Sequence, residues 1–217
     1  MAKVDVLIPT FNRGAMLKEA VQSILRQTMS DFRILIWDDG STDGSTDPKA
    51  LPSDPRIVVL NRGGENQGIA HARTQLLAAV EAPFACWQDS DDLSSPDRLM
   101  KMLAHLEKSG ADIAFSYIYF FNGNVTRKHW HLRKVDTSRY GPAKPGFGLD
   151  GNMTHPTAMF RRCLCRYPVP DIGRAYGTDR FWLVSLIQAG VKFSHLTEPL
   201  YFLRRHPSRV TKQRRGG

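Results

Sequence analysis

The chain has 217 residues, of which 41% are hydrophobic, so its length and composition fit one folded domain with its own core. Its 30 Lys and Arg against 21 Asp and Glu give a net charge of +9, which favours anionic partners such as nucleotide diphosphates, lipid head groups or nucleic acid. No apolar run approaches the roughly twenty residues of a membrane-spanning helix, and the amino terminus lacks the charged-then-apolar pattern of a secretion signal.

Strands and helices alternate along the first half of the chain. Four apolar runs predict strands, at residues 4–8, 32–37, 57–60 and 84–88. Apolar residues at helical spacing predict a helix after the first, the third and the fourth of these runs. Asn12 is expected to cap the first helix, whereas Ser95 caps the third and Pro96 opens it. This order is typical of an α/β domain with a mostly parallel central sheet flanked by helices.

The second half continues this pattern less regularly. A β-rich run at residues 112–121 predicts a long strand. Two shorter runs predict closing strands, at residues 191–195 and 200–203. Between them, Thr178 is expected to cap a helix that ends at Gly190. Residues 122–151 are basic, polar and dotted with Pro and Gly, so loops are expected there.

Carboxylates gather where two of the predicted strands end. Asp38 and Asp39 follow the second strand, and Asp89, Asp91 and Asp92 follow the fourth. Three bare carboxylates would repel one another, and such a cluster commonly binds a hard divalent cation through oxygen ligands. The carboxyl ends of strands are also where open α/β sheets bind ligands. The pattern therefore indicates a metal and phosphate site; the alternative is a solvated acidic loop before the next helix.

Several motifs in register resemble the family 2 glycosyltransferases. They are residues 4–13 (VDVLIPTFNR), 23–28 (SILRQT), 37–43 (WDDGSTD), 66–73 (NQGIAHAR) and the acidic cluster. The resemblance is dense from residue 3 to about residue 106 and sparser afterwards. It implies a Rossmann-like α/β domain, the GT-A fold, and a metal-dependent enzyme that transfers a sugar from a nucleotide donor to a hydroxyl with inversion.

The resemblance implies a donor site in the first half of the chain. Pro9, Thr10 and Phe11 correspond to the turn that wraps the base and ribose, although Phe11 also fits a core position. Asp39 corresponds to a carboxylate that accepts a hydrogen bond from the base, which favours uracil or thymine (UDP or dTDP) without excluding guanine. Two further residues of this site are Asn66, in the loop before the second predicted helix, and Arg73, on that helix.

The acidic cluster is expected to contact the sugar nucleotide and a divalent cofactor, Mn²⁺ or Mg²⁺. Asp89 and Ser90 correspond to residues near the ribose, and Asp91 corresponds to the metal ligand. Asp92 either helps through water or caps the turn. His206 lies in a Tyr-x-x-Arg-x-His element, where the histidine joins the metal or the diphosphate; a plain surface or core histidine explains it equally well.

Asp179 corresponds to the family's catalytic base, which takes the proton of the acceptor hydroxyl. The alternative is a first-turn carboxylate stabilised by the helix dipole. The family more often has an acidic pair at this point, whereas this chain has Thr178 and Asp179. The segment that starts at His155 resembles the family's acceptor side, or else a plain link between a strand and a helix.

We expect one domain over residues 1–217. It comprises a nucleotide-sugar-binding half (1–110), an acceptor-binding and catalytic half (111–203) and a basic tail (204–217). The tail suits contact with an anionic membrane and therefore a lipid-linked acceptor, or else it is a frayed cationic terminus. Three cysteines without a zinc-ligand pattern favour reduced thiols and therefore a cytoplasmic protein. The basic tail is compatible with a peripheral location at the inner membrane face.

Two other functions fit parts of the sequence. A sugar nucleotidyltransferase would share the nucleotide site, but a glycine-rich, lysine-bearing pyrophosphate loop is not found near the amino terminus. A non-catalytic nucleotide- or nucleic-acid-binding module would fit the basic charge, but the acidic clusters would repel a polyanion. Nucleic acid is therefore not expected as a partner, whereas a nucleotide-sugar donor and a glycan or lipid-linked acceptor are.

Overall fold

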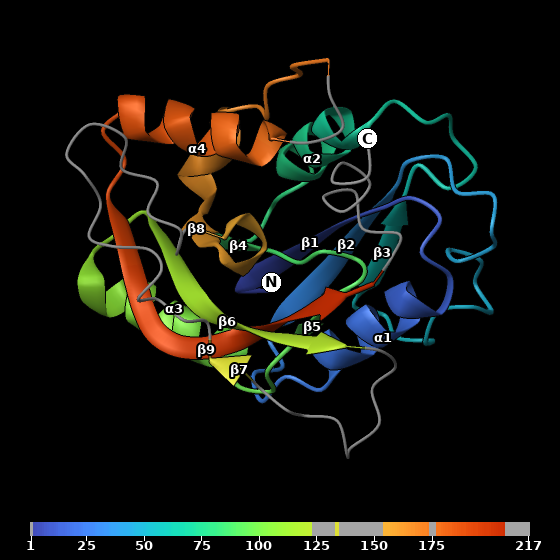
Figure 1. Cartoon of the computed structure of the whole chain (residues 1–217), viewed down its shortest axis with the longest axis horizontal. Helices are drawn as coiled ribbons and strands as arrows, with labels where there is room; N and C mark the ends of the chain where they lie inside the picture. Colours follow the sequence, from blue (N-terminus) through green and yellow to red (C-terminus); the bar gives the residue numbers. More distant parts are fainter. Residues whose placement is uncertain (1, 123–132, 135–153, 174–176, 207–217) are drawn as a thin grey trace.

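The computed structural model describes residues 2–122, 133–134, 154–173 and 177–206. One sheet runs through this part of the chain, with its strands in the order β3-β2-β1-β4-β8-β6-β9-β5 and β7 (Arg133–Lys134) paired to β6. Helices cover both faces of the sheet (Figure 1). The predicted α/β architecture is therefore present. The sequence pattern did not predict the order of the strands in the second half of the sheet.

The amino-terminal half of the sheet is parallel. It consists of β1 (Val4–Thr10), β2 (Phe32–Asp38), β3 (Ile57–Leu60) and β4 (Phe84–Trp87). Every residue of β1 is buried, as expected for a central parallel strand with helices on both faces. These four strands match the predicted ones within two residues at each end. A short, uninterrupted apolar run is typically buried as a strand of a parallel sheet.

The other half makes the sheet mixed. β8 (Met159–Arg161) pairs antiparallel with β4 and with β6 (Ile113–Asn122), while β9 (Phe193–Arg205) runs parallel to β6 and β5 (Leu93–Ser94) runs antiparallel to β9. The two closing strands predicted from sequence are one long strand, β9. Register shifts on both sides of Tyr117 absorb the irregularity where β6 meets Pro199, since proline cannot donate to the ladder.

The helices form two layers, each with its own core. α1 (Gly14–Leu25) and α3 (Arg98–Ser109) cover one face, and α2 (Ile69–Ala78) and α4 (Thr178–Gln188) cover the other (Figure 1). Two short 3₁₀ helices, η2 (His155–Thr157) and η3 (Arg162–Arg166), flank β8. Among the helices of the described residues, none is both long and apolar enough to cross a membrane.

The three predicted helix caps are wrong. Asn12 lies in the left-handed region (φ 50°), and its Oδ1 accepts a hydrogen bond from Thr42 N (2.8 Å). The first turn of α1 is instead stabilised from another loop, by Asp43 Oδ2, which accepts from Gly14 N (2.8 Å). A local pattern cannot reveal a cap that comes from a residue 29 positions away.

The other two caps fail for local reasons. Helix α3 begins at Arg98, so Ser95 and Pro96 precede it, and Ser95 Oγ donates to Asp97 Oδ1 (2.6 Å) instead of to the helix. Thr178 is the first residue inside α4, preceded by Gly177 in the left-handed region. Its hydroxyl is used elsewhere, as an acceptor for Arg73.

The long strands bring the far edge of the sheet back to its middle. β4 ends at Trp87 and β5 starts at Leu93, so the acidic residues lie on the short loop between them. β5 pairs with β9 through Leu93 and Phe202, and β6 and β9 curve across the molecule (Figure 1). The end of β9 therefore lies beside the acidic loop, although about 110 residues separate the two segments in sequence.

His155 is a core residue. Its ring lies between Trp87 (4.9 Å between centroids) and Trp182 (5.6 Å) and is 3% exposed. Neither ring nitrogen has a hydrogen-bond partner among the described residues. Burial, with the nearby charge of Arg73, holds the pKa of His155 well below its ordinary value of 6.5. His155 itself packs between two tryptophans, and the acceptor-side role of the segment that starts with it stays a prediction.

We predict that His155→Phe reduces the acid sensitivity of the fold. The unfolded chain protonates His155 below about pH 6.5 and the folded chain does not, so this group removes up to about 1.4 kcal/mol of stability per pH unit as the pH falls. The free energy of unfolding, measured by urea titration between about pH 7 and pH 5, should fall less steeply in the variant. Equal slopes in the two proteins would contradict the assignment.

Candidate active site

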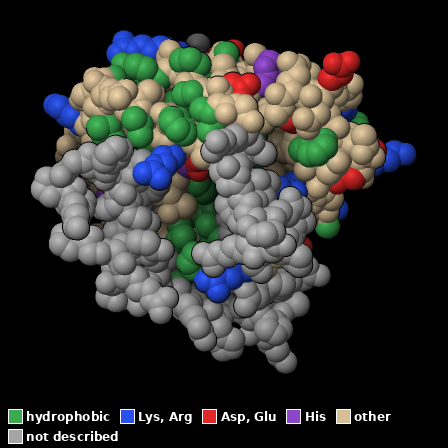
Figure 2. Space-filling model, turned by 45° about the horizontal axis from the view of Figure 1, so that its top comes forward, with side chains coloured by type: hydrophobic (Ala, Val, Ile, Leu, Met, Phe, Trp, Pro, Cys, Tyr) green, Lys and Arg blue, Asp and Glu red, His purple; other side chains and the backbone are tan. Residues whose placement is uncertain are grey.

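A cleft of about 470 Å³ opens at the carboxyl ends of β1, β2 and β4. Six of the predicted donor-site residues line it: Pro9, Thr10, Phe11, Asp39, Asn66 and Ser90. Its other walls were not foreseen and come mainly from Arg13, Gln67, Gly68, Asp171 and Gly173. On the face drawn in Figure 2, hydrophobic and basic side chains of the described residues lie close together.

Asp39 fixes one wall of the cleft. Its Oδ1 accepts a hydrogen bond from Gln67 N (2.9 Å) and its Oδ2 accepts from Gly68 N (2.9 Å), while its own N–H donates to Thr10 O (2.9 Å). Gly40 is required beside it, because its φ is +82° and a Cβ would lie 2.7 Å from Asn66 N. The carboxylate thus joins three segments and retains lone pairs toward the cleft.

Three residues around Asp39 have distinct surroundings. Phe11 is 44% exposed and lines the cleft, so it is not a core residue. Asp38 accepts from Ser41 N (2.8 Å) and from the hydroxyl of Thr46, so it orders the turn. Thr10 Oγ1 is buried without a hydrogen-bond partner among the described residues; such a hydroxyl in a cleft wall is a group that a ligand would satisfy.

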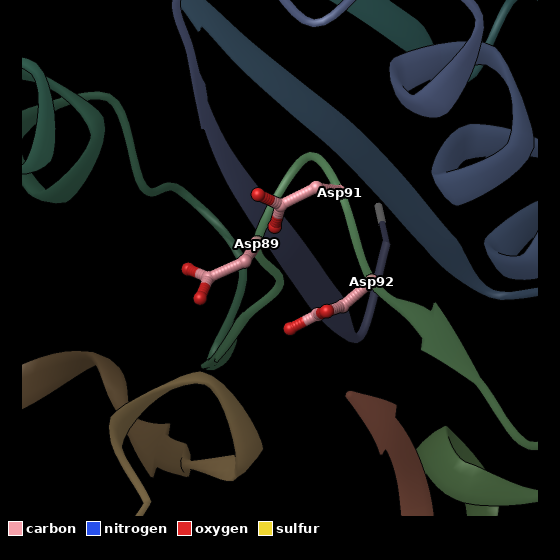
Figure 3. Close-up of side chains that lie close together, drawn as sticks. All are labelled: Asp89, Asp91 and Asp92. Carbon is pink, nitrogen blue, oxygen red and sulfur yellow. The ribbon is translucent and has the colours of Figure 1, made fainter. Parts of the chain in front are cut away.

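The acidic cluster forms as predicted. One carboxylate oxygen from each of Asp89, Asp91 and Asp92 lies within 4.8 Å of the others, and the side chains project to the same side of the loop between β4 and β5 (Figure 3). Asp91 and Asp92 are buried, and Asp89 is partly exposed. The alternative of a solvated acidic loop is therefore excluded for two of the three residues.

Two arginines and a histidine lie beside the cluster. Asp91 Oδ2 lies 3.4 Å from Arg13 Nε and 3.1 Å from His206 Nε2. On the other side, Arg73 Nη2 lies 4.0 Å from Asp89 Oδ1. The structure therefore brings together the two predicted metal ligands, Asp91 and His206, and adds a competing cation, Arg13, on the same carboxylate oxygen.

Arg204 connects the acidic loop to β9 and to α1. Its N–H donates to Asp92 Oδ1 (2.7 Å), its Nε donates to Asp91 O (2.8 Å), and its Nη2 pairs with Glu19 of α1. The guanidinium also lies over the ring of Phe121 (4.8 Å). The expectation of a basic tail from residue 204 is therefore wrong at its start, because Arg204 is 3% exposed within β9. Residues 207–217 lie outside the described part.

Arg98 and Tyr201 hold the stems of this loop. Buried Arg98 donates to Trp87 O (2.8 Å) at the end of β4 and to Ser94 Oγ (2.8 Å) in β5, and lies over the ring of Tyr201 (4.8 Å). Tyr201 Oη accepts from Asp89 N (3.0 Å). Burial, with the charges of Asp92 and Asp89, raises the pKa of Tyr201 well above its ordinary value, so the phenol stays neutral.

Asp179 lies half-buried in the first turn of α4, where its Oδ1 accepts from Arg180 N (2.9 Å). The preceding residue, Thr178, is fully buried and its Oγ1 accepts from Arg73 Nη1 (3.0 Å). Arg73 also reaches Asp89, so the start of α4 is tied to the acidic cluster through one arginine. Asp171 and Gly173, which precede α4, line the cleft itself.

Comparison with known proteins identifies the chain's family. The model of the family described as Glycosyl transferase family 2 matches residues 5–166. The chain belongs to this family. A relative from Rickettsia conorii, named as an uncharacterized glycosyltransferase, is 34% identical over 128 residues, which cover 58% of this chain and 20% of that protein. The chain thus spans about a fifth of the length of this relative.

Solved structures share the fold. TarS 1–349 from S. aureus in complex with UDP-GlcNAc is 18% identical, with a TM-score of 0.72 over 95% of this chain and 60% of that one. The mannosyltransferase PcManGT from Pyrobaculum calidifontis, in complex with GDP-Man and Mn²⁺, is 20% identical, with a TM-score of 0.62 over 96% and 58%. The GT-A fold predicted from the family 2 resemblance is confirmed.

Three residues of this family 2 site escaped the sequence analysis as site residues. Arg13 lies inside a matched motif but was assigned no contact, Tyr201 was quoted only as part of the His206 element, and Arg204 was assigned to the tail. Their shared signal is an arginine or tyrosine within two to five residues of a predicted site residue. The inward positions of Tyr201 and Arg204 depend on the course of β9, which the sequence does not show, whereas Arg13, at the start of α1, reaches Asp91.

We predict that Tyr201→Phe lowers the free energy of unfolding by about 1–2 kcal/mol, because the Asp89 N–H loses the acceptor that the buried Tyr201 hydroxyl provides. Tyr167→Phe is the matched control: its hydroxyl accepts from Arg166 at an exposed position, so its loss should be below about 0.5 kcal/mol. Urea unfolding of both variants measures the difference. Equal losses would show that the Tyr201 hydroxyl does not support the loop.

Proposed function

We propose that this chain is a metal-dependent, inverting glycosyltransferase. It transfers a sugar from a UDP- or dTDP-linked donor to a hydroxyl of a glycan or lipid-linked acceptor, as in cell-surface polysaccharide synthesis. The observation that carries the proposal is the cleft of about 470 Å³, because it joins a wall suited to a base, at Phe11 and Asp39, to the acidic cluster at Ser90. Membership of family 2 favours sugar transfer over nucleotide transfer or plain binding.

The base and ribose are proposed to lie against the amino-terminal wall. Exposed Phe11 offers a ring face for stacking, and Asp39 offers lone pairs to the ring N–H of uracil or thymine. Thr10 and Asn66 supply further polar groups, and Arg73 and Asp89 lie farther along, toward the ribose and phosphates. Guanine also carries a ring N–H, and PcManGT has GDP-Man bound, so the choice of base is tested directly below.

Asp91 and His206 are proposed to hold the divalent cation. The donors fit a hard ion, because three carboxylate oxygens lie within 4.8 Å of one another and the His206 imidazole lies 3.1 Å from one oxygen of Asp91. Such an ion, Mn²⁺ or Mg²⁺, supplies Lewis-acid neutralisation of the leaving diphosphate. The protein's own part is to fix the carboxylates before the donor arrives, through Arg204 and Tyr201.

Asp179 is proposed to act as the base. Its carboxylate takes the proton from the acceptor hydroxyl while that oxygen bonds to the anomeric carbon, and the bond from this carbon to the diphosphate oxygen breaks. The nucleoside diphosphate leaves, and the configuration inverts. The placement is supported by Thr178, whose bond to Arg73 ties the start of α4 to the cluster.

The acceptor side is proposed from sequence alone. We propose that the predicted loops at residues 122–151 lie near the acceptor; residues 123–132 and 135–153 fall outside the described part, as do residues 207–217. A cytoplasmic location, with contact between the basic tail and an anionic membrane, belongs to the same proposal.

Calorimetric titration of UDP, dTDP and GDP, with and without Mn²⁺, tests the donor site. Wild type should bind UDP or dTDP more tightly with Mn²⁺, and Asp91→Asn should lose about tenfold or more of that affinity. Glu107→Gln, which removes an exposed carboxylate on α3, should bind like wild type. A folded wild type that binds none of the three would overturn the proposed function.

Asp179→Asn tests the base. Release of UDP from a UDP-sugar, with water as a slow acceptor, should fall by a factor of about 10²–10⁴, whereas calorimetry should find UDP affinity within about twofold of wild type, since the base does not hold the nucleotide. Retained turnover would remove Asp179 from the mechanism, and a parallel loss of UDP affinity would assign it to donor binding instead.

A further inference from the structure

Arg13 and His206 share one oxygen of Asp91. Arg13 Nε lies 3.4 Å from Oδ2, and His206 Nε2 lies 3.1 Å from the same atom. The arginine is well shielded, with 19% of its side chain exposed against 11% for Asp91. An ion pair with this little exposure is screened less than a surface pair. Arg13 therefore neutralises the carboxylate that is proposed to bind the metal.

The two neighbours differ in what a divalent cation would require of them. A neutral imidazole can ligate through Nε2 and remain in place. A guanidinium keeps its proton and has no lone pair to give, so it cannot be a ligand. A cation on Asp91 Oδ2 would therefore repel Arg13 from that oxygen while His206 stays. Only one of the two partners has to move.

The cleft offers Arg13 a second partner. Its side chain lines the cleft together with Phe11 and Ser90, and it also contacts Asp91 of the acidic cluster. A nucleoside diphosphate that spans these two regions passes beside Arg13. Guanidinium groups bind phosphate oxygens in a bidentate manner, so the negative charge lost at Asp91 is replaced by that of the diphosphate.

We propose that Arg13 is an exchange residue, which pairs with Asp91 in the empty site and binds the diphosphate of the donor once a divalent cation takes its place. This inference rests on the proposed function, since it needs both a cation and a nucleoside diphosphate. It gives Arg13 two opposed effects: it opposes binding of the cation alone and favours binding of the nucleotide.

Arg13→Gln tests the exchange through binding alone. The affinity for Mn²⁺ without nucleotide, measured from the electron paramagnetic resonance signal of free Mn²⁺, should rise about two- to fivefold, because a competing ion pair is removed. The affinity for UDP at saturating Mn²⁺, measured by calorimetry, should fall about tenfold or more. Lys18→Gln removes the same charge from an exposed position on α1 and should change neither affinity more than about twofold.

Opposite changes in the two affinities support the exchange, since a residue with a merely structural role would weaken both. If Arg13→Gln has an unchanged or weaker Mn²⁺ affinity, or an unchanged UDP affinity, the exchange is overturned. The proposed function stands in that case as long as the wild type binds Mn²⁺ and UDP. A folded wild type that binds neither Mn²⁺ nor UDP would overturn both. Arg13→Lys adds a check, because it keeps the charge without the bidentate geometry. Its Mn²⁺ affinity should be close to that of wild type, whereas its UDP affinity should stay below that of wild type.

Discussion

The constraint on which the rest of this structure depends is the mutual repulsion of Asp89, Asp91 and Asp92. Their carboxylate oxygens lie within 4.8 Å of one another, where each ionised pair costs roughly 3–4 kcal/mol at an effective dielectric constant near 20. Two of the three are buried, so water alone does not compensate them. The fold meets this cost with positive charges from Arg13, Arg73 and Arg204 and with a contact from His206 to Asp91, and in doing so builds the site.

The compensating groups explain the unusual course of the sheet. A parallel α/β unit of β1 to β4 would leave the loop after β4 open at the sheet's carboxyl edge. Instead, β6 and β9 curve back so that β9 pairs with β5. This pairing delivers Tyr201 to the main chain of Asp89 and Arg204 to Asp91 and Asp92. The mixed half of the sheet thus serves the acidic loop as well as the core.

The site divides into a rigid wall and a charged centre. On the wall, hydrogen bonds from backbone groups to and from Asp39 join β1, β2 and the loop before α2, and Gly40 leaves room for that loop, so the wall is held by the protein's own bonds. In the centre, Asp91 has partners that a ligand would rearrange. A preformed wall lowers the entropic cost of binding a nucleotide. In the proposed exchange of Arg13 from Asp91 to the diphosphate, binding of the cation favours binding of the nucleotide.

Much of the site could be predicted because its residues are local in sequence. Phe11, Asp39 and the acidic cluster each follow a strand directly, and the ends of parallel strands meet at one edge of a sheet, so alternation and motif spacing were enough to place them together. The helix caps failed for the opposite reason. Asn12 has the chemistry of a cap, yet Asp43, from a distant loop, supplies the bond to Gly14, and local propensity carries no information about such a partner.

The sequence by itself determined the α/β order, the parallel half of the sheet, the acidic cluster and the resemblance to family 2, since each is written in short apolar runs and fixed motifs. Only the tertiary structure decided that Arg204 is buried and not part of a tail, that Arg13 shares Asp91 with His206, and that His155 packs between two tryptophans. These outcomes depend on which distant segments the curved strands bring together. A charged side chain near a motif looks the same in sequence whether it faces water or an unsatisfied carboxylate, and the folded chain alone distinguishes the two.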